Sequence, residues 1–535
     1  MDHAHDHAGA CFVCAAASRE ARFESVAPPV PGRRRFLAQA IGAGLVGTAV
    51  AGAAHARSDA RGPNPAAFRD RDRRYAIDAG LALVEESGAL VVRREVTLLV
   101  DRDRIEAVMD GFASSRRVGR IARLDARTHF VTPGFISGHT HVAGGTTTRG
   151  IIESGRSFAR PLELADTLAD DELDAVTAFN LAELILSGCT TQVEQSLSLK
   201  QARSYVRVAR RFGARGYPGG MIPGIHRLFP IWFRADDRAL HDSVPGTLAE
   251  IEANLEFGRR FMGTEEGRIR PMMAPHATDT QTPATMQALA AAARELGTGL
   301  HIHLSQSASE TATVRRLWGM TPAQWCDSFG LLDGTFFGAH MNGLDFDVDA
   351  PLLNARGAVY AHCPSAGGAG GGTQPYPEAL GRGMKVNIGI DTHSNDYVEN
   401  LKLAVLSGKV RRSLLGSSAN PLVDPTMLRA IDGATRVGAD RLRRPDLGRI
   451  APGAKADLVC IDVSGPLVGV GALPREPLNN LLYAHGLSVR HVMTDGRLQV
   501  WNGRFVAEDF ARIAQEAGAA IERLWGMLAA EGYFD

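Results

Sequence analysis

The spacing of apolar residues changes twice along the chain and divides it into three stretches. Between residues 75 and 130, and again after about residue 447, short apolar runs alternate with charged or glycine-bearing turns, a pattern typical of β-strands. Between residues 131 and 446, short apolar strands alternate with longer segments of helical spacing, such as 171–188 and 283–297. We therefore expect an α/β protein with a central strand–helix repeat between two β-rich flanks.

The central stretch has the strand count of a (β/α)8 TIM barrel. Repeated strand–helix alternation over this length is typical of a parallel barrel. The two flanks are too short to bury separate cores, so we expect them to pair into one small β-sandwich. The eight expected barrel strands lie at 135–141, 190–195, 214–221, 268–277, 299–305, 335–341, 358–364 and 385–391.

These patterns predict five segments along the chain. A C-terminal helix is expected to follow the second β-rich flank, because the apolar residues there return to helical spacing. The predicted segments are a leader with an export signal at 1–56, sandwich segments at 57–130 and 447–510, the barrel at 131–446 and the final helix at 511–535.

The charge balance excludes some classes of function. The 535 residues include 59 basic and 59 acidic side chains, so the formal net charge is zero. A protein that binds nucleic acid or an anionic membrane surface usually carries a basic excess, which is absent here. We expect a small-molecule substrate and no nucleic-acid partner, and a homo-oligomer is compatible with this composition.

The segment 33–56 resembles a twin-arginine export signal. Arg33 and Arg34 are followed by Phe36 and Leu37, by an uncharged stretch at 38–54, and by small residues at 54–56 that suit a signal peptidase. A transmembrane anchor is the alternative, but 17 weakly apolar residues fall short of the roughly 20 that a span needs. We expect the twin-arginine export machinery as a partner, a periplasmic or secreted location, and no stable membrane span after processing.

Histidine and aspartate residues gather at the ends of the expected barrel strands, where the active sites of such barrels lie. Because side chains two residues apart on a strand point the same way, His139 and His141 can reach one metal ion. His303, His340 and Asp391 end three further strands. Imidazoles with one carboxylate suit one divalent ion, with zinc expected first and iron or manganese as alternatives, whereas calcium or magnesium would need more oxygen ligands.

A metal ion in such a site activates water at neutral pH. Asp391 is then suited both to bind the ion and to accept the proton of the water. His340, where it is not a ligand, can hydrogen-bond the group under attack. We therefore expect Asp391 and His340 to be catalytic.

Seven motifs resemble those of the amidohydrolase superfamily, in the branch of guanine and cytosine deaminases, S-adenosylhomocysteine deaminase and triazine hydrolases. The resemblance spans about residues 75–510 and implies one metal ion held by His139, His141, His303 and Asp391, with His340 as a non-ligand near the scissile bond. The motifs lie at 132–141, 183–191, 301–305, 338–340, 361–366, 389–395 and 453–463.

Gln306 departs from the deaminase pattern, which has a glutamate at this position as a proton shuttle to a ring nitrogen. An amide can donate and accept hydrogen bonds but cannot transfer a proton at neutral pH. Glu310 lies one helical turn further on. We therefore favour metal-dependent hydrolysis of a C–N bond in an amide, cyclic amide or urea-like substrate. The alternatives are a deaminase or dechlorinase of a nitrogen heterocycle, and a catalytically retired exported metal-binding protein.

Loops after the strands are expected to form the pocket walls. The loops at 144–158 and 224–234 carry arginines and aromatic residues that are suited either to clamping a planar or anionic substrate or to packing under a long loop. The residues expected to contact substrate are Gln306, His226 and Arg149. Glu194 ends the second expected strand, where it can either reach the site or cap a helix.

Overall fold

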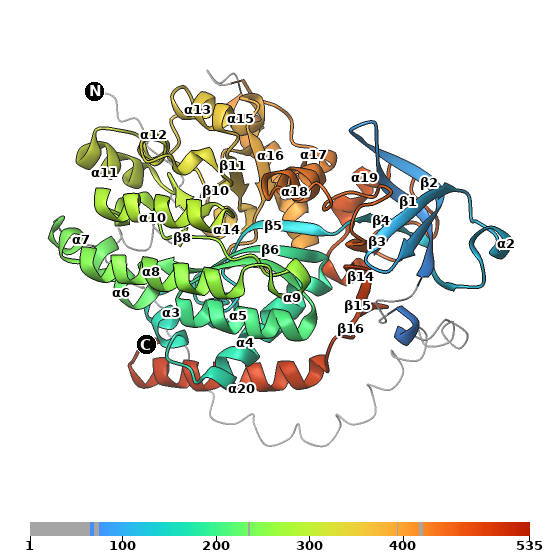
Figure 1. The fold of residues 1–535 in the computed structure, drawn as a ribbon, viewed down its shortest axis with the longest axis horizontal. Coiled ribbons are helices and arrows are strands. Elements are labelled where there is room, and N and C mark those ends of the chain that lie inside the picture. Colours follow the sequence, from blue (N-terminus) through green and yellow to red (C-terminus); the bar gives the residue numbers. More distant parts are fainter. Residues whose placement is uncertain (1–64, 69–73, 234–235, 393, 417–420) are drawn as a thin grey trace, which may run out of the picture.

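A computed structural model describes residues 65–68, 74–233, 236–392, 394–416 and 421–535 (Figure 1). The leader and export signal predicted at 1–56 lie outside the described residues. Among the residues that are described, no helix combines the length and the apolar character needed to cross a membrane.

Eight parallel strands form the barrel. They make up two four-stranded sheets, in the orders β5-β6-β7-β8 and β9-β10-β11-β12. Bridges from Met273 to Leu300 and from Ala277 to His303 join the sheets at one seam, and a bridge from Thr140 to Asp391 closes the other. The strands are β5 (Phe135–Thr140), β6 (Cys189–Ser196), β7 (Arg215–Ile222), β8 (Ala274–Pro275), β9 (Leu300–Leu304), β10 (Phe336–His340), β11 (Val359–His362) and β12 (Lys385–Ile388). The predicted (β/α)8 barrel is therefore confirmed.

Helices cover the outside of the barrel, and local signals set their ends. In α10 (Pro283–Leu296), the Thr282 side chain accepts the Thr285 N–H, and Gly297 takes the left-handed conformation that ends the helix. The other long helices of the outer layer are α4 (Asp170–Leu186), α5 (Leu199–Phe212), α8 (Val244–Phe261), α11 (Ala308–Trp318) and α16 (Tyr397–Leu415). Shorter helices include α3 (Ala159–Ala165), α6 (Ile225–Trp232), α12 (Pro322–Ser328), α13 (Asp349–Arg356), α14 (Pro364–Ala369), α15 (Tyr376–Gly381), α17 (Met427–Asp432) and α18 (Gly438–Arg441).

The two β-rich flanks join into one eight-stranded sheet with the order β16-β15-β14-β13-β4-β1-β2-β3. The joint is the antiparallel pairing of β13 with β4, and side chains from both flanks share one hydrophobic core. This confirms the expected β unit built from both ends of the chain. Its strands are β1 (Arg74–Glu86), β2 (Ala89–Asp101), β3 (Arg104–Asp110), β4 (Ala122–Pro133), β13 (Leu458–Asp462), β14 (Val489–Thr494), β15 (Arg497–Trp501) and β16 (Arg504–Phe505).

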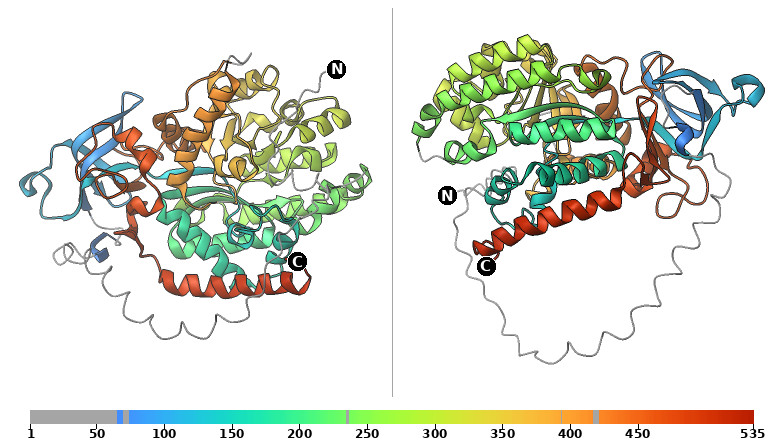
Figure 2. Two further views of the ribbon diagram at one scale, coloured as in Figure 1. Left: turned by 180° about the vertical axis from the view of Figure 1, so that it is seen from behind. Right: turned by 60° about the horizontal axis from the view of Figure 1, so that its bottom comes forward.

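A buried ion cluster and a long helix fix the barrel to this sheet. Arg215, at the start of β7, lies 3.3 Å from Asp457 and 2.5 Å from Asp495, and all three side chains are almost fully buried. The final helix α20 (Phe510–Ala530) leaves the sheet and runs along the barrel against α4 and α3 (Figure 2). Both connections hold the flanking sheet at the end of the barrel away from the carboxyl ends of its strands.

Candidate active site

Five predicted side chains meet at the carboxyl ends of the barrel strands. His139 lies in β5, His141 directly follows that strand, His303 lies in β9, His340 ends β10, and Asp391 follows β12. The ligand atoms of His139, His141 and His303 lie within 4.8 Å of one another, and so do those of His139, His340 and Asp391. All five side chains are buried.

Backbone carbonyls set the protonation of two of the histidines. The Nδ1 atom of His141 lies 2.6 Å from the carbonyl oxygen of Gln195, and Nδ1 of His303 lies 2.6 Å from that of His276. A carbonyl can only accept, so each Nδ1 carries the proton and each Nε2 keeps its lone pair. These two Nε2 atoms face each other at 3.4 Å. Two lone pairs so close are unfavourable unless a cation lies between them.

His139 completes the set of nitrogen donors. Its Nδ1 lies 3.2 Å from Nε2 of His301, and its Nε2 has no hydrogen-bond partner among the described residues. Burial and the neighbouring histidines hold the pKa of His139 well below its usual value, so the ring is neutral. A buried, neutral imidazole with an unpartnered Nε2 fits a metal ligand, with His301 holding the ring in place.

Asp391 bridges two of the histidines. Its Oδ1 lies 3.6 Å from Nε2 of His141, and its Oδ2 lies 3.6 Å from Nε2 of His340. The backbone of Asp391 has a φ of 61°, and that of His340 has a φ of 75°. Left-handed backbone at non-glycine residues is uncommon and gathers at functional sites. A side chain at Gly389 would meet His139 and Cys363, so only glycine lets this segment approach β5 closely.

Gln374 determines which nitrogen of His340 carries the proton. The Cys363 N–H donates to Oε1 of Gln374 at 2.8 Å, which fixes the orientation of the amide. Nε2 of Gln374 lies 3.2 Å from Nδ1 of His340 and therefore donates to it. A neutral His340 then carries its proton on Nε2, which is the nitrogen that faces Asp391.

Glu194 neither lines the cavity beside the cluster nor caps a helix. Its carboxylate accepts from the Thr140 hydroxyl at 2.6 Å, the Val142 N–H at 3.1 Å and the Ser196 hydroxyl at 2.8 Å. Burial raises the pKa of Glu194 to about 7 against these hydrogen bonds. Because Thr140 lies between His139 and His141, this carboxylate anchors the strand end that carries both histidines.

Gln306 lies in the cavity wall beside the cluster, whereas Glu310 lies behind it. The Glu310 carboxylate accepts the Gln306 N–H at 2.6 Å and hydrogen bonds from Thr278. Burial and the charge of Asp279 raise the pKa of Glu310 to about 8. Because Glu310 is committed to the backbone and does not line the cavity, it does not supply the carboxylate that the deaminase pattern would have at Gln306.

The structure does not bring His226 or Arg149 to this cavity. The His226 side chain is 58% exposed on α6 and lies 3.8 Å from Glu250. Arg149 pairs with Glu183 of α4 at 2.8 Å. In both cases a carboxylate on a neighbouring helix binds the polar side chain at the surface, while apolar residues of the same loops turn inward.

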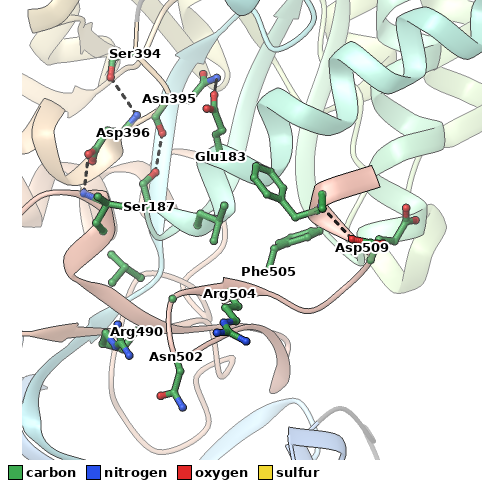
Figure 3. Close-up of a pocket in the computed structure, with 18 of the residues that line it drawn as sticks. Glu183, Ser187, Ser394, Asn395, Asp396, Arg490, Asn502, Arg504, Phe505 and Asp509 are labelled. Carbon is green, nitrogen blue, oxygen red and sulfur yellow. Dashed lines mark hydrogen bonds between the residues drawn. The ribbon is translucent and has the colours of Figure 1, made fainter. Parts of the chain in front are cut away.

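Arg149 and Glu183 instead border a wider groove of about 1160 Å3. Figure 3 shows how it opens between Asn395 and Ser187 on one side and Arg504 and Phe505 on the other. Among the described residues, the groups of metal-ligating side chains that lie close enough to share an ion are both in the barrel. The larger groove therefore has, in the described part of the chain, no group of metal-ligating side chains like the one beside the smaller cavity.

Three residues near the cluster were missed by sequence reasoning. His276 lines the cavity after β8, and it follows the same rule of a histidine at a strand end that marked the others. His301 and Gln374 act through hydrogen bonds to other side chains, and no spacing in the sequence marks such partners.

A family model for the amidohydrolase family matches residues 130–498 of this chain. The chain belongs to the amidohydrolase family. It is 31% identical to a 5-methylthioadenosine/S-adenosylhomocysteine deaminase of Nitratidesulfovibrio vulgaris, over 80% of this chain and 90% of that one. A deaminase of the same name from Desulfitobacterium hafniense is 28% identical, over 74% and 86% of the two chains.

Solved structures with the same fold include hydrolases that contain zinc. Atrazine chlorohydrolase of Arthrobacter aurescens, complexed with zinc, has a TM-score of 0.69 at 22% identity, covering 84% of this chain and all of that one. An adenosine deaminase of Xanthomonas campestris with bound zinc also has a TM-score of 0.69 at 22% identity, covering 84% and 98% of the two chains. This amidohydrolase is a metal-dependent hydrolase of carbon–nitrogen bonds other than peptide bonds, as the sequence predicted.

Proposed function

We propose that one zinc ion is bound by His139, His141, His303 and Asp391, and that the enzyme hydrolyses a C–N bond in a small cyclic organic molecule. The observation that carries this proposal is the pair of Nε2 lone pairs on His141 and His303, which face each other at 3.4 Å. Nitrogen-rich ligand sets with one carboxylate suit zinc, and two structural neighbours hold zinc.

A bound ion of this kind supplies an activated water and polarises the bond that the water attacks. Asp391 lies beside both His141 and His340, so its carboxylate is placed to take the proton of the attacking water and to pass it to the leaving nitrogen. The Nε2 proton of His340 is placed to hydrogen-bond the atom that gains negative charge. Gln374 keeps that proton on the nitrogen that faces the site.

Gln306 decides which C–N bonds suit this site. Its amide can hydrogen-bond a substrate but cannot protonate a ring nitrogen, and Glu310 is held away from the cavity. The chemistry that remains needs only a proton transfer through Asp391, which suits a cyclic amide or urea-like bond. A deaminase is the second candidate, because the relatives at 28–31% identity are named as deaminases.

The test is turnover of cyclic amides, ureas, purines, pyrimidines and triazines by the zinc-loaded protein. We expect ring opening without release of ammonia, and we expect Asp391→Asn to lose turnover by roughly 10²–10⁴-fold, the usual contribution of general acid–base catalysis. Ammonia release from an aminated heterocycle would support the deaminase. Full activity of Asp391→Asn would refute its role in proton transfer.

We further propose that the twin-arginine machinery exports the protein, which is then periplasmic or secreted. The support is the pattern of Arg33, Arg34, Phe36 and Leu37 before the apolar stretch 38–54. Changing both arginines to lysine should leave the precursor in the cytoplasm, and cell fractionation measures this. Export of that variant at the normal level would contradict the proposal.

A further inference from the structure

Nine of the residues that line the cavity beside the metal cluster are apolar, and we call them the apolar wall. These residues come from the segments after β5 and β6, from the end of β7 and from the segment after it, and they pack into one hydrophobic cluster. They are Ile152, Phe158, Leu162, Leu197, Met221, Ile225, Leu228, Phe229 and Trp232.

Few polar side chains line the cavity. Apart from the cluster itself, they are His276, Gln306 and Thr392. The His276 ring packs against that of Trp232, with 4.8 Å between the ring centroids. Asp391 is the one charged side chain among the described lining residues, and it belongs to the metal cluster.

The arginines in the loops that carry the apolar wall pair with groups outside the cavity. Arg149 pairs with Glu183, Arg227 pairs with Glu250, and Arg156 donates to the backbone carbonyls of Tyr533 and Phe534. No arginine or lysine lines the cavity among the residues that the structure describes. An anionic group on the part of the substrate that packs against the apolar wall would therefore be desolvated without an arginine or lysine to pair with it, which disfavours binding.

We infer that the substrate is an uncharged molecule whose aromatic or branched alkyl body packs on this apolar wall, with its scissile C–N bond toward Gln306 and His276. The inference deepens the proposed function and rests on the proposed metal site. Apolar contact favours such a body because it removes apolar surface from water. It disfavours substrates that carry a carboxylate, a phosphate or an amino-acid tail.

We expect Trp232 to limit how much of the apolar wall a ligand can reach. The cavity measures about 40 Å3, which holds about three water molecules at the roughly 10–15 Å3 that each needs. Of the nine wall residues, Trp232 is the half-buried one, and its ring packs on His276 at 4.8 Å. An aromatic ligand must displace this ring, whereas Phe233 next to it is 43% exposed and does not line the cavity.

The test compares three hydroxamates, which bind a divalent ion through the same two oxygens. The probes are acetohydroxamate, benzohydroxamate and 4-carboxybenzohydroxamate, titrated calorimetrically into the zinc-loaded full chain. We expect benzohydroxamate to bind at least about tenfold more tightly than either of the others, because only it places an uncharged ring on the wall.

Two arginine variants sharpen the comparison. Trp232→Arg places a cation at the cavity mouth and should shift the preference toward the carboxylated probe, whereas Phe233→Arg places the same charge one residue away and should leave the preference unchanged. Equal or tighter binding of 4-carboxybenzohydroxamate by the unmodified protein would overturn the apolar-substrate inference and leave the metal site standing. Failure of all three probes to bind would overturn both.

Discussion

At the scale of single residues, three histidines of the site are each held through Nδ1 by a partner, which leaves Nε2 to face the proposed ion. His141 and His303 use backbone carbonyls of neighbouring strands, and His139 uses His301. Because each ring is fixed through Nδ1, its orientation is set before metal binds, and the three Nε2 atoms point toward the proposed metal position. The site is therefore organised by the barrel itself.

Gln374 is expected to act as a positioning residue for His340. Gln374→Met keeps the volume but removes the donor, so His340 can shift its proton to Nδ1. We expect kcat to fall by roughly 10²–10⁴-fold, the size of an acid–base contribution, with zinc content unchanged. Nitrogen-15 NMR of the histidines reports the tautomer directly. Unchanged kcat with the proton still on Nε2 would show that Gln374 is not needed for this role.

Glu310 should make stability depend on pH. Its pKa in the folded protein is raised to about 8, above its ordinary value of about 4.3, so the folded state holds a proton that the unfolded state releases. Its stabilising contribution is complete below the ordinary pKa and is lost as the pH rises through about 8.

Urea unfolding of Glu310→Gln against the unmodified protein measures this effect. The free energy of unfolding of the unmodified protein should fall relative to that of the variant between pH 4.5 and 8. Glu522→Gln, at an exposed position on α20, is the control and should show no such trend. A difference that is constant with pH would mean that Glu310 is ionised in the folded protein.

At the scale of elements, the sequence predicts the barrel strands well, because the spacing of apolar residues that marks a strand lies within the strand itself. The eight strand segments follow from the spacing of apolar residues. The joined flanks follow from the short length of each β-rich segment, and the five side chains of the cluster follow from their positions at strand ends. The inward or outward direction of loop side chains does not, because it depends on partners distant in sequence. Arg149 turns to Glu183, and His226 turns toward Glu250, which no pattern within either loop reveals.

Arg215 is expected to carry much of the junction between barrel and sheet. Its side chain is 1% exposed between Asp457 and Asp495. Arg215→Met leaves Asp457 buried without its ion-pair partner and removes the nearest partner of Asp495, which should lower the free energy of unfolding by about 3–5 kcal/mol. Asp495 keeps Arg268 and Lys455, each at 3.4 Å. Arg210→Met removes an exposed ion pair with Glu265 and should cost less than about 1 kcal/mol. Equal losses in the two variants, measured by urea unfolding, would contradict a structural role for the buried cluster.

At the scale of the whole molecule, the groove beside α20 and the cavity in the barrel differ in the side chains that they offer for catalysis. The groove beside α20 is far larger than the cavity in the barrel, yet only the cavity adjoins buried, neutral histidines and a shared carboxylate. The flanking sheet packs at the end of the barrel where the strands begin, and α20 packs along its side (Figure 2). The carboxyl ends of the strands are therefore available to form the active site.

The most direct test is the zinc content of the purified full chain after dialysis, measured by mass spectrometry of the metal. We expect about one zinc ion per chain, lost from a His141→Asn and His303→Asn double variant and retained by His276→Asn, whose side chain lines the same cavity outside the cluster. Circular dichroism checks that each variant is folded. A folded protein that takes up no zinc, iron or manganese, or a double variant with undiminished metal content, would contradict the metal site.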